Sequence, residues 1–202
     1  MLYFLMHNFI KILSSLLLLA SCTLADTNTT TPKEKTNTEW IVDGHVLPPE
    51  PDKALNDSTL LGIDSNKNGV RDDVERWIYK TYKHPIERGI FMQSARAYNM
   101  VIVDPSKALE TMKYVVNAAH CESYWSMGIL RMKQRNLNYT LGEYRDLEKE
   151  IENIQFNTLD RRLAYHRFNK KLSGGVYGDD LEPDEWIDSC EFDKNGVLKA
   201  LK

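Results

Sequence analysis

Apolar residues recur at helical spacing through most of the chain after residue 70. Along DDVERWIYKTY, steps of three and four place four apolar side chains on one helix face: Val74, Trp77, Ile78 and Tyr82. The stretch PIERGIFMQSARAYNMVIV predicts a second helix over residues 85–103. The dipeptide Asp104-Pro105 ends it, because the residue before a proline disfavours helical backbone.

Two further helices are expected beyond this stop. The first is long, is capped by Asp104 or Ser106, and ends near NLNYT. Its apolar residues stand at near-heptad spacing: Leu109, Met112, Val116, Ala119, Met127 and Leu130. The second begins at Thr140, where Glu143 completes a capping box, and ends at the following SGG. Its stripe comprises Leu147, Ile151, Ile154, Thr158, Tyr165 and Leu172.

Strand-like alternation is confined to one short piece, EWIVDGHVLPPEP, before the first helix. The pattern therefore predicts an all-α fold: a small antiparallel helical bundle with an extended N-terminal arm and an irregular C-terminal arm. Of the 202 residues, 42% are hydrophobic and 27% are charged, which is ordinary for a globular domain. A net charge of −3 gives no reason to expect nucleic acid as a partner. The basic stretches RMKQR and RRLAYHRFNK are interpreted as solvated helix faces, because their helices also carry acids.

The N-terminus carries a cellular address. MLYFLMHNFIKILSSLLLLASC has one cation, Lys11, followed by an apolar run that is too short to span a membrane. Its last residues, LASC, resemble the lipobox of bacterial lipoproteins, in which the cysteine is acylated and the peptide before it is removed. The resemblance implies a signal peptide at residues 1–21 and lipidation of Cys22. The alternative is a buried N-terminal helix with a chance cysteine.

Residues 22–39 are rich in Thr and Asn and almost free of large apolar groups, which predicts a disordered tether. Residues 40–202, from Trp40 onward, are then the folded periplasmic domain. Because Thr23 rather than an aspartate follows the cysteine, the resemblance to lipoproteins favours the outer membrane over the inner one. We therefore expect a lipid-anchored protein of the cell envelope that faces the periplasm.

Two cysteines remain once Cys22 carries lipid. In an oxidising compartment this even count predicts a disulfide between Cys121 and Cys190, which pins the C-terminal arm onto the long helix. Two unpaired thiols are the alternative. A catalytic pair is not expected, because the chain has no Cys-x-x-Cys spacing.

One segment, DSNKNGVRDDVE at residues 64–75, matches the calcium-loop pattern D-x-[DN]-x-[DN]-G-x5-E in full. Calcium takes about six to eight oxygen ligands, which alternate residues of a tight loop can present, and a glycine permits the sharp turn. The segment resembles the EF-hand family and, more closely, the calcium loops of dockerins and thrombospondin type 3 repeats. The resemblance implies calcium as the cofactor, held by the side chains of Asp64, Asn66, Asn68, Asp72 and Glu75 and the carbonyl of Val70.

Two features separate this loop from a paired EF-hand. Position 8, usually apolar, is Arg71, and proline and turn-forming residues crowd the place of an entering helix. The C-terminal EFDKNGVLKALK repeats the Asp-x-Asn-Gly core without a distal carboxylate and is interpreted as a turn. Two Asn ligands predict a modest dissociation constant of about 10⁻⁴ to 10⁻³ M and a structural role for the ion. The alternative is an Asx-rich turn that caps the helix without metal.

Catalysis is not expected. The histidines His45, His84, His120 and His166 are scattered and fall in no zinc spacing. His120 precedes Glu122 closely, but neighbouring helical residues point in different directions, and an enzyme would need a cleft that gathers them with His166. The sequence favours a non-catalytic binding or scaffolding module with a protein partner in the envelope, of undetermined oligomeric state. The alternative is a periplasmic inhibitor or immunity-type lipoprotein directed against a toxin or hydrolase.

Overall fold

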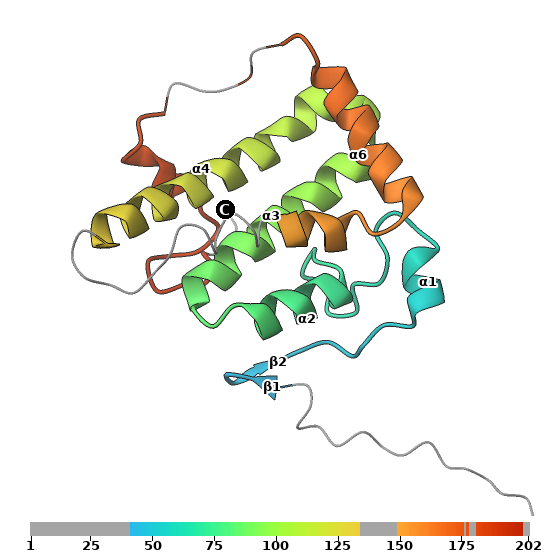
Figure 1. Ribbon diagram of the computed structural model, residues 1–202, viewed down its shortest axis with the longest axis horizontal. Helices are drawn as coiled ribbons and strands as arrows, with labels where there is room; N and C mark the ends of the chain where they lie inside the picture. The colour runs from blue at the N-terminus through green and yellow to red at the C-terminus, as the bar shows by residue number, and fades with distance from the viewer. Residues whose placement is uncertain (1–40, 134–148, 176, 178–180, 200–202) are drawn as a thin grey trace, which may run out of the picture. The chain divides into compact units, whose positions relative to one another are not determined.

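Long helices account for most of the described chain (Figure 1). The structure is a computed structural model that describes residues 41–133, 149–175, 177 and 181–199. The long helices are α2 (Asp72–Thr81), α3 (Pro85–Val103), α4 (Ala108–Lys133) and α6 (Leu159–Leu172). All described elements belong to one unit, Thr36–Lys202. The predicted all-α fold class is therefore confirmed.

Short elements flank these helices. They are β1 (Ile41–Val42), β2 (His45–Val46), α1 (Lys53–Asp57) and the 3₁₀ turns η2 (Pro105–Lys107) and η3 (Glu185–Ser189). The strands β1 and β2 pair antiparallel as a hairpin, with Ile41 opposite Val46, where the sequence predicted a short extended piece. Since α1 has only five residues, no long helix leads into the loop of residues 64–75.

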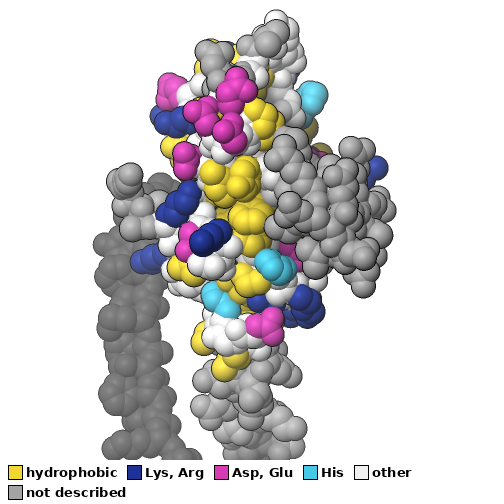
Figure 2. Space-filling model, turned by 90° about the vertical axis from the view of Figure 1, so that its left-hand side faces the viewer, with side chains coloured by type: hydrophobic (Ala, Val, Ile, Leu, Met, Phe, Trp, Pro, Cys, Tyr) yellow, Lys and Arg dark blue, Asp and Glu magenta, His cyan; other side chains and the backbone are white. Residues whose placement is uncertain are grey.

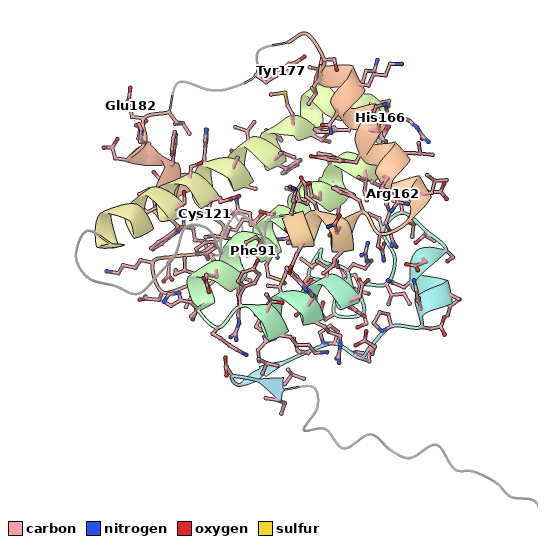
Figure 3. All side chains as sticks on the ribbon, in the orientation of Figure 1. Phe91, Cys121, Arg162, His166, Tyr177 and Glu182 are labelled. Carbon is pink, nitrogen blue, oxygen red and sulfur yellow. A yellow bond between two sulfur atoms is a disulfide. The ribbon has the colours of Figure 1, made fainter. Side chains whose placement is uncertain are left out.

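Helix α3 is central, because α2, α4 and α6 all pack against it. It ends at Val103, directly before the predicted stop at Asp104-Pro105. Its side chains are buried around most of the circumference, and Figure 3 shows Phe91 in the middle of the bundle. The buried face of α2 carries Val74 and packs on α3, as the periodicity of the sequence predicted.

The buried face of α4 is not the expected one. Leu109 is 67% exposed and Ala119 is also exposed, so the predicted stripe is wrong at these two positions, whereas Met112 packs against the core as predicted. The buried positions of α4 are small or polar: Ala108, Thr111, Ala118 and Cys121. Small side chains at these positions allow α4 to pack closely against its neighbours, whereas the larger Leu109 remains exposed to solvent. The side chains of Met127 and Leu130 lie outside the described residues.

The single helix expected up to Leu172 is broken at residues 156–158. Residues 149–155 are helical, and α6 then starts after Thr158, whose hydroxyl accepts a hydrogen bond from the backbone N–H of Arg161 (3.3 Å). A threonine placed on the stripe by its spacing is thus a helix cap. The end of α6 at the sequence SGG agrees with the prediction.

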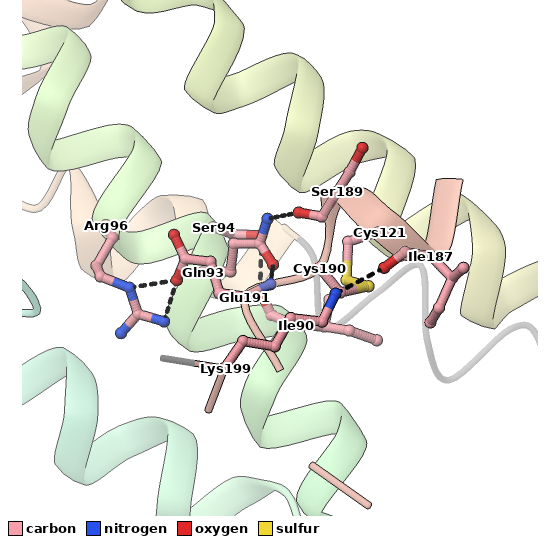
Figure 4. The surroundings of a disulfide bond; sticks show 10 residues. All are labelled: Ile90, Gln93, Ser94, Arg96, Cys121, Ile187, Ser189, Cys190, Glu191 and Lys199. Carbon is pink, nitrogen blue, oxygen red and sulfur yellow. Dashed lines mark hydrogen bonds and ion pairs between the residues drawn. A yellow bond between two sulfur atoms is a disulfide. The ribbon is translucent and has the colours of Figure 1, made fainter. Parts of the chain in front are cut away.

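The C-terminal arm is fastened to α3 and α4 (Figure 4). The disulfide between Cys121 and Cys190 is present as predicted. On the α3 side, the amide of Gln93 donates a hydrogen bond to the carbonyl of Ser189 (2.8 Å) and accepts one from the N–H of Glu191 (3.0 Å). One covalent bond and two hydrogen bonds thus hold the same short stretch of the arm.

The Asp-x-Asn-Gly stretch of the C-terminal arm is a turn, as predicted. The side chain of Asp193 accepts hydrogen bonds from the N–H groups of Asn195 (2.8 Å) and Val197 (3.0 Å). Gly196 adopts φ +80°, a conformation that glycine takes without strain.

Several expectations concern residues that lie outside the described part. They are the signal peptide at 1–21, Cys22, the tether at 22–39, Trp40 and the capping box of Thr140 and Glu143. Within the described residues, none of the helices has the length and hydropathy to cross a membrane.

Candidate metal centre

The loop of residues 64–75 is wound around the carboxylate of Asp64. Its Oδ1 accepts a hydrogen bond from the N–H of Asn68 (3.1 Å), and its Oδ2 accepts one from the N–H of Gly69 (2.8 Å). Gly69 has φ +83° and Lys67 has φ +57°, so two positions of the loop take the left-handed conformation. A tight winding of this kind brings alternate side chains toward one centre, and the glycine at the sixth position allows it.

The start of α2 closes the loop. The N–H of Asp72 donates to the carbonyl of Ile63 (2.8 Å), and Asp72 Oδ1 accepts a hydrogen bond from the N–H of Ser65 (2.9 Å). The other oxygen, Oδ2, is buried without a hydrogen-bond partner, and the residue is 0% exposed. Burial raises the pKa of Asp72, and the nearby charges of Asp64 and Glu75 raise it further, against the hydrogen bonds from Ser65. A bound cation would give the unpartnered oxygen a partner and would offset the repulsion between these carboxylates.

Two of the predicted ligands, Asn66 and Asn68, meet at a third, Glu75, which is 0% exposed. Its Oε2 accepts hydrogen bonds from the side-chain amides of Asn66 (3.0 Å) and Asn68 (2.7 Å). Its Oε1 lies 2.9 Å from Nε2 of His45 on β2. Two side-chain amides and one imidazole therefore contact this buried carboxylate. The sequence did not single out His45 for this role, because no fixed spacing ties the hairpin to the loop.

A cation would reverse the role of the two amides. Each asparagine carries a donor NH₂ and an acceptor oxygen on the same planar group, and a rotation exchanges them. After that rotation, the oxygens of Asn66 and Asn68 would face the region that their nitrogens now face, next to Glu75. Within the described residues, no three His, Cys, Asp or Glu side chains stand together as a ready metal cluster.

The middle of the loop is fixed to the core. Val70 is 0% exposed and packs in one cluster with Val74, which holds the backbone at the predicted carbonyl ligand. Arg71 is also 0% exposed, and its guanidinium donates hydrogen bonds to the carbonyls of Gln155 (3.1 Å) and Ile154 (2.6 Å). Because Arg71 points into its own bundle, position 8 does not present the apolar bridge of a paired EF-hand.

A second buried arginine anchors the segment before the loop. Arg161 of α6 is 0% exposed and donates hydrogen bonds to the carbonyls of Leu60 (2.9 Å) and Thr59 (3.0 Å). Gly62 has φ +65°, and a Cβ added there would lie 2.3 Å from Cδ of Arg71. The sequence analysis did not predict this anchorage. Gly62, just before the loop, is the residue that could have indicated it.

The residues that an enzyme would need occupy different surroundings. His120 on α4 stacks on Trp186 of the C-terminal arm, with ring centroids 5.1 Å apart and planes 3° from parallel. His166 is exposed on α6, as Figure 3 shows. The expectation that the chain is not an enzyme stays a prediction.

A mostly apolar hollow of about 690 Å³ lies beside the loop. Asp64 and Gly69 of the loop form part of its wall, and Met100 of α3 and Tyr114 of α4 form its apolar side. Hollows with apolar walls and a few polar groups are typical of binding sites.

No protein-family model, curated protein or solved structure matches this chain. No function therefore comes from relationship to a known protein. The loop of residues 64–75 and the hollow beside it are the features on which a function can be proposed.

Proposed function

We propose that this chain is a lipid-anchored cell-envelope protein whose helical domain binds one structural calcium ion and acts as a non-catalytic binding or scaffolding module. The observation that carries the ion site is the convergence of Asn66 and Asn68 on the buried carboxylate of Glu75. The unpartnered, buried Oδ2 of Asp72 supports the same centre independently. A loop that offers carboxylate, amide and carbonyl oxygens suits a hard cation such as Ca²⁺.

The ion would join the loop that begins at Asp64 to the first turn of α2. In this proposal it is held by the side-chain oxygens of Asp64, Asn66, Asn68, Asp72 and Glu75 and by the carbonyl of Val70. It offsets the charge of the buried carboxylates and fixes the loop to α2. At about 1 mM calcium and a dissociation constant of about 0.1 mM, the ion adds about 1.4 kcal/mol to the free energy of unfolding.

The cellular location has two supports. The LASC sequence before residue 23 resembles a lipobox. The disulfide between Cys121 and Cys190 is the kind of bond that persists in an oxidising compartment such as the periplasm. In this proposal the tether of residues 22–39 connects the domain to its lipid anchor, and the hollow beside the loop receives an envelope partner.

The calcium site is tested with residues 23–202, which start after the lipidation site and contain the whole unit Thr36–Lys202. Calcium is titrated by calorimetry and by its effect on the melting temperature. Saturable binding is expected with a dissociation constant of about 10⁻⁴ to 10⁻³ M. The variant Glu75→Gln keeps the shape of the side chain but removes its charge, so this binding should be lost.

The matched control for this titration is Asp193→Asn. Asp193 stands in the C-terminal Asp-x-Asn-Gly turn, where its oxygens accept backbone hydrogen bonds. This variant should bind calcium as the parent does. No heat and no melting shift in the parent at several millimolar calcium would reduce residues 64–75 to a helix cap.

The anchor is tested separately with the full chain and its Cys22→Ser variant in a Gram-negative host. The parent should be acylated and should sediment with membranes, while the variant should lose the acyl label. An acyl label that persists in the variant would show that Cys22 is not the attachment site.

A further inference from the structure

The outer face of α6 is strongly basic, although the whole chain has a net charge of −3. The exposed charged side chains of this helix are four cations and one acid: Arg162, Arg167, Lys170, Lys171 and Asp160. Within the described part of the chain, none of the four cations forms an ion pair. Figure 3 shows Arg162 and His166 along this helix. The described residues therefore do not neutralise these four cations by ion pairing.

The turn η2 extends this basic face, because it packs directly on α6. A hollow of about 510 Å³ between them is lined by Asp104, Pro105, Ser106, Arg167, Lys170 and Lys171. The one carboxylate in the hollow is Asp104, whose Oδ1 accepts hydrogen bonds from the N–H (3.1 Å) and the hydroxyl (2.6 Å) of Ser106. Lys107 of η2 is exposed as well. Three cations against one carboxylate give the lining of the hollow an excess of positive charge.

Two leucines stand on the same face as the cations. Leu159 is 63% exposed and Leu163 is 40% exposed. With His166 and Lys170 they recur at steps of four, three and four, which forms one outward line along a helix. A helix face that combines leucines with Lys and Arg is typical of helices that lie on a lipid surface.

Acidic side chains gather on a different part of the molecule. The C-terminal arm carries the exposed residues Glu182, Asp184, Glu185 and Asp188. Figure 2 shows a group of acids at the top of the face on the left-hand side of Figure 1, whereas α6 lies on the right-hand side. Close to α6, the carboxylate of Asp57 pairs with the buried Arg161 (3.1 Å), so the excess of positive charge belongs to the outer face of this helix and not to a whole side of the domain.

We propose that the outer face of α6 docks onto an anionic phospholipid bilayer, with its cations against the lipid phosphates and its leucines at the level of the headgroups. Charge complementarity selects the lipid, and the exposed leucines favour a bilayer over an acidic polypeptide. The docking goes beyond the calcium site and does not need it. A tether of residues 22–39 would reach far enough, because eighteen extended residues span up to about 60 Å.

The test uses unlipidated residues 23–202, so that an acyl chain cannot supply the binding. Co-sedimentation is measured with vesicles of phosphatidylcholine alone and with vesicles in which about a third of the lipid is phosphatidylglycerol. Binding to the anionic vesicles is expected, and it should weaken as salt rises from about 0.1 to about 0.5 M. Each cation removed should lower the partition coefficient about fivefold.

Two pairs of lysines make matched variants. Lys170→Gln with Lys171→Gln neutralises the last turn of α6, and the partition coefficient should fall about 25-fold. Lys80→Gln with Lys83→Gln removes the same charge elsewhere, from one exposed lysine in the last turn of α2 and one in the connection that follows it. This control pair should bind nearly as the parent does. All these lysines are exposed, so folding, checked by circular dichroism, should be unaffected.

Four outcomes would overturn the proposal. They are equal binding to neutral and anionic vesicles, an equal loss in the two lysine pairs, binding that requires calcium, and binding of polyglutamate as tight as that of the anionic vesicles. The last would assign the face to an acidic polypeptide. Because calcium titration of the same variants is independent of this assay, failure of the docking and failure of the calcium site are distinguishable.

Discussion

The imidazole of His45 and the carboxylate of Glu75 meet across 30 residues of sequence, with Nε2 lying 2.9 Å from Oε1. The same imidazole stacks on the ring of Tyr79, with centroids 4.0 Å apart and planes 12° from parallel. Glu75 is fully buried, and His45 contacts it from the hairpin of β1 and β2. One side chain therefore ties the N-terminal hairpin to the candidate metal centre.

Replacing His45 should loosen this connection. In calcium-free solution, His45→Ala should lower the free energy of unfolding by about 1 to 2 kcal/mol, because it removes a hydrogen bond to a charged group and an aromatic contact. Urea unfolding measures the change. Val46→Ala is the control on the same strand, since Val46 is 62% exposed, and its effect should stay within about 0.5 kcal/mol. Equal losses would mean that His45 contributes nothing beyond the hairpin.

The disulfide should contribute strongly to stability. Cys121 and Cys190 are 69 residues apart, and closing a loop of that length restricts the unfolded chain by about 4 kcal/mol. The double variant Cys121→Ala and Cys190→Ala should lose about this much in urea unfolding. Reductant should destabilise the parent similarly and leave the variant unchanged. If reductant added to the unfolded parent leaves its free energy of unfolding unchanged, the two cysteines are not bonded in solution.

The buried carboxylate of Glu87 should make stability depend on pH. Its Oε2 accepts a hydrogen bond from the N–H of His84 at the start of α3 (3.4 Å). Burial raises the pKa of Glu87 above 4.5, although His84 and Arg88 lower it. Because the folded pKa exceeds the unfolded one, the stability from this group is complete below the unfolded pKa. It is lost as the pH rises through the folded pKa.

The variant Glu87→Gln should remove this dependence, since its amide oxygen can still accept the bond from His84. Its free energy of unfolding should fall less than that of the parent as the pH rises above about 4.5, and it should be the more stable protein at pH 7. Urea unfolding across a pH series tests this. Glu110→Gln, at an exposed position of α4, should keep the slope of the parent. A parallel slope for Glu87→Gln would exclude Glu87 as its source.

Local signals predicted the features that depend on neighbouring residues. The end of α3 followed from Asp104-Pro105, and the glycine conformation of the loop followed from Gly69 in its motif. Longer helices needed information that lies outside their own sequence. Helix α4 buries Ala118 and packs Met112 against the core, while Leu109 remains exposed. The break before α6 depends on Thr158, which spacing alone placed on a continuous stripe.

The surroundings of the candidate site were the least predictable part. Arg71 and Arg161 are completely buried, although arginine is normally a surface residue, because backbone carbonyls accept their hydrogen bonds. Those carbonyls belong to Gln155 and Leu60, which come from other segments of the chain. No pattern within residues 64–75 contains that information, so the motif indicates which residues are candidate ligands but not the groups that position them.

Gly62 should be irreplaceable for reasons of space as well as backbone. It has φ +65°, and an added Cβ would lie 2.3 Å from Cδ of Arg71 and 2.5 Å from Oδ1 of Asn56. Gly62→Ala should therefore lower the free energy of unfolding by about 3 kcal/mol and weaken calcium binding, because Arg71 must leave its place. Gly174 provides the control, since it has φ +86° but nothing within 4 Å of an added Cβ. Gly174→Ala should cost only about 1 kcal/mol, the backbone contribution alone. Equal costs in urea unfolding would show that Arg71 moves aside freely and that the loop is anchored by other contacts.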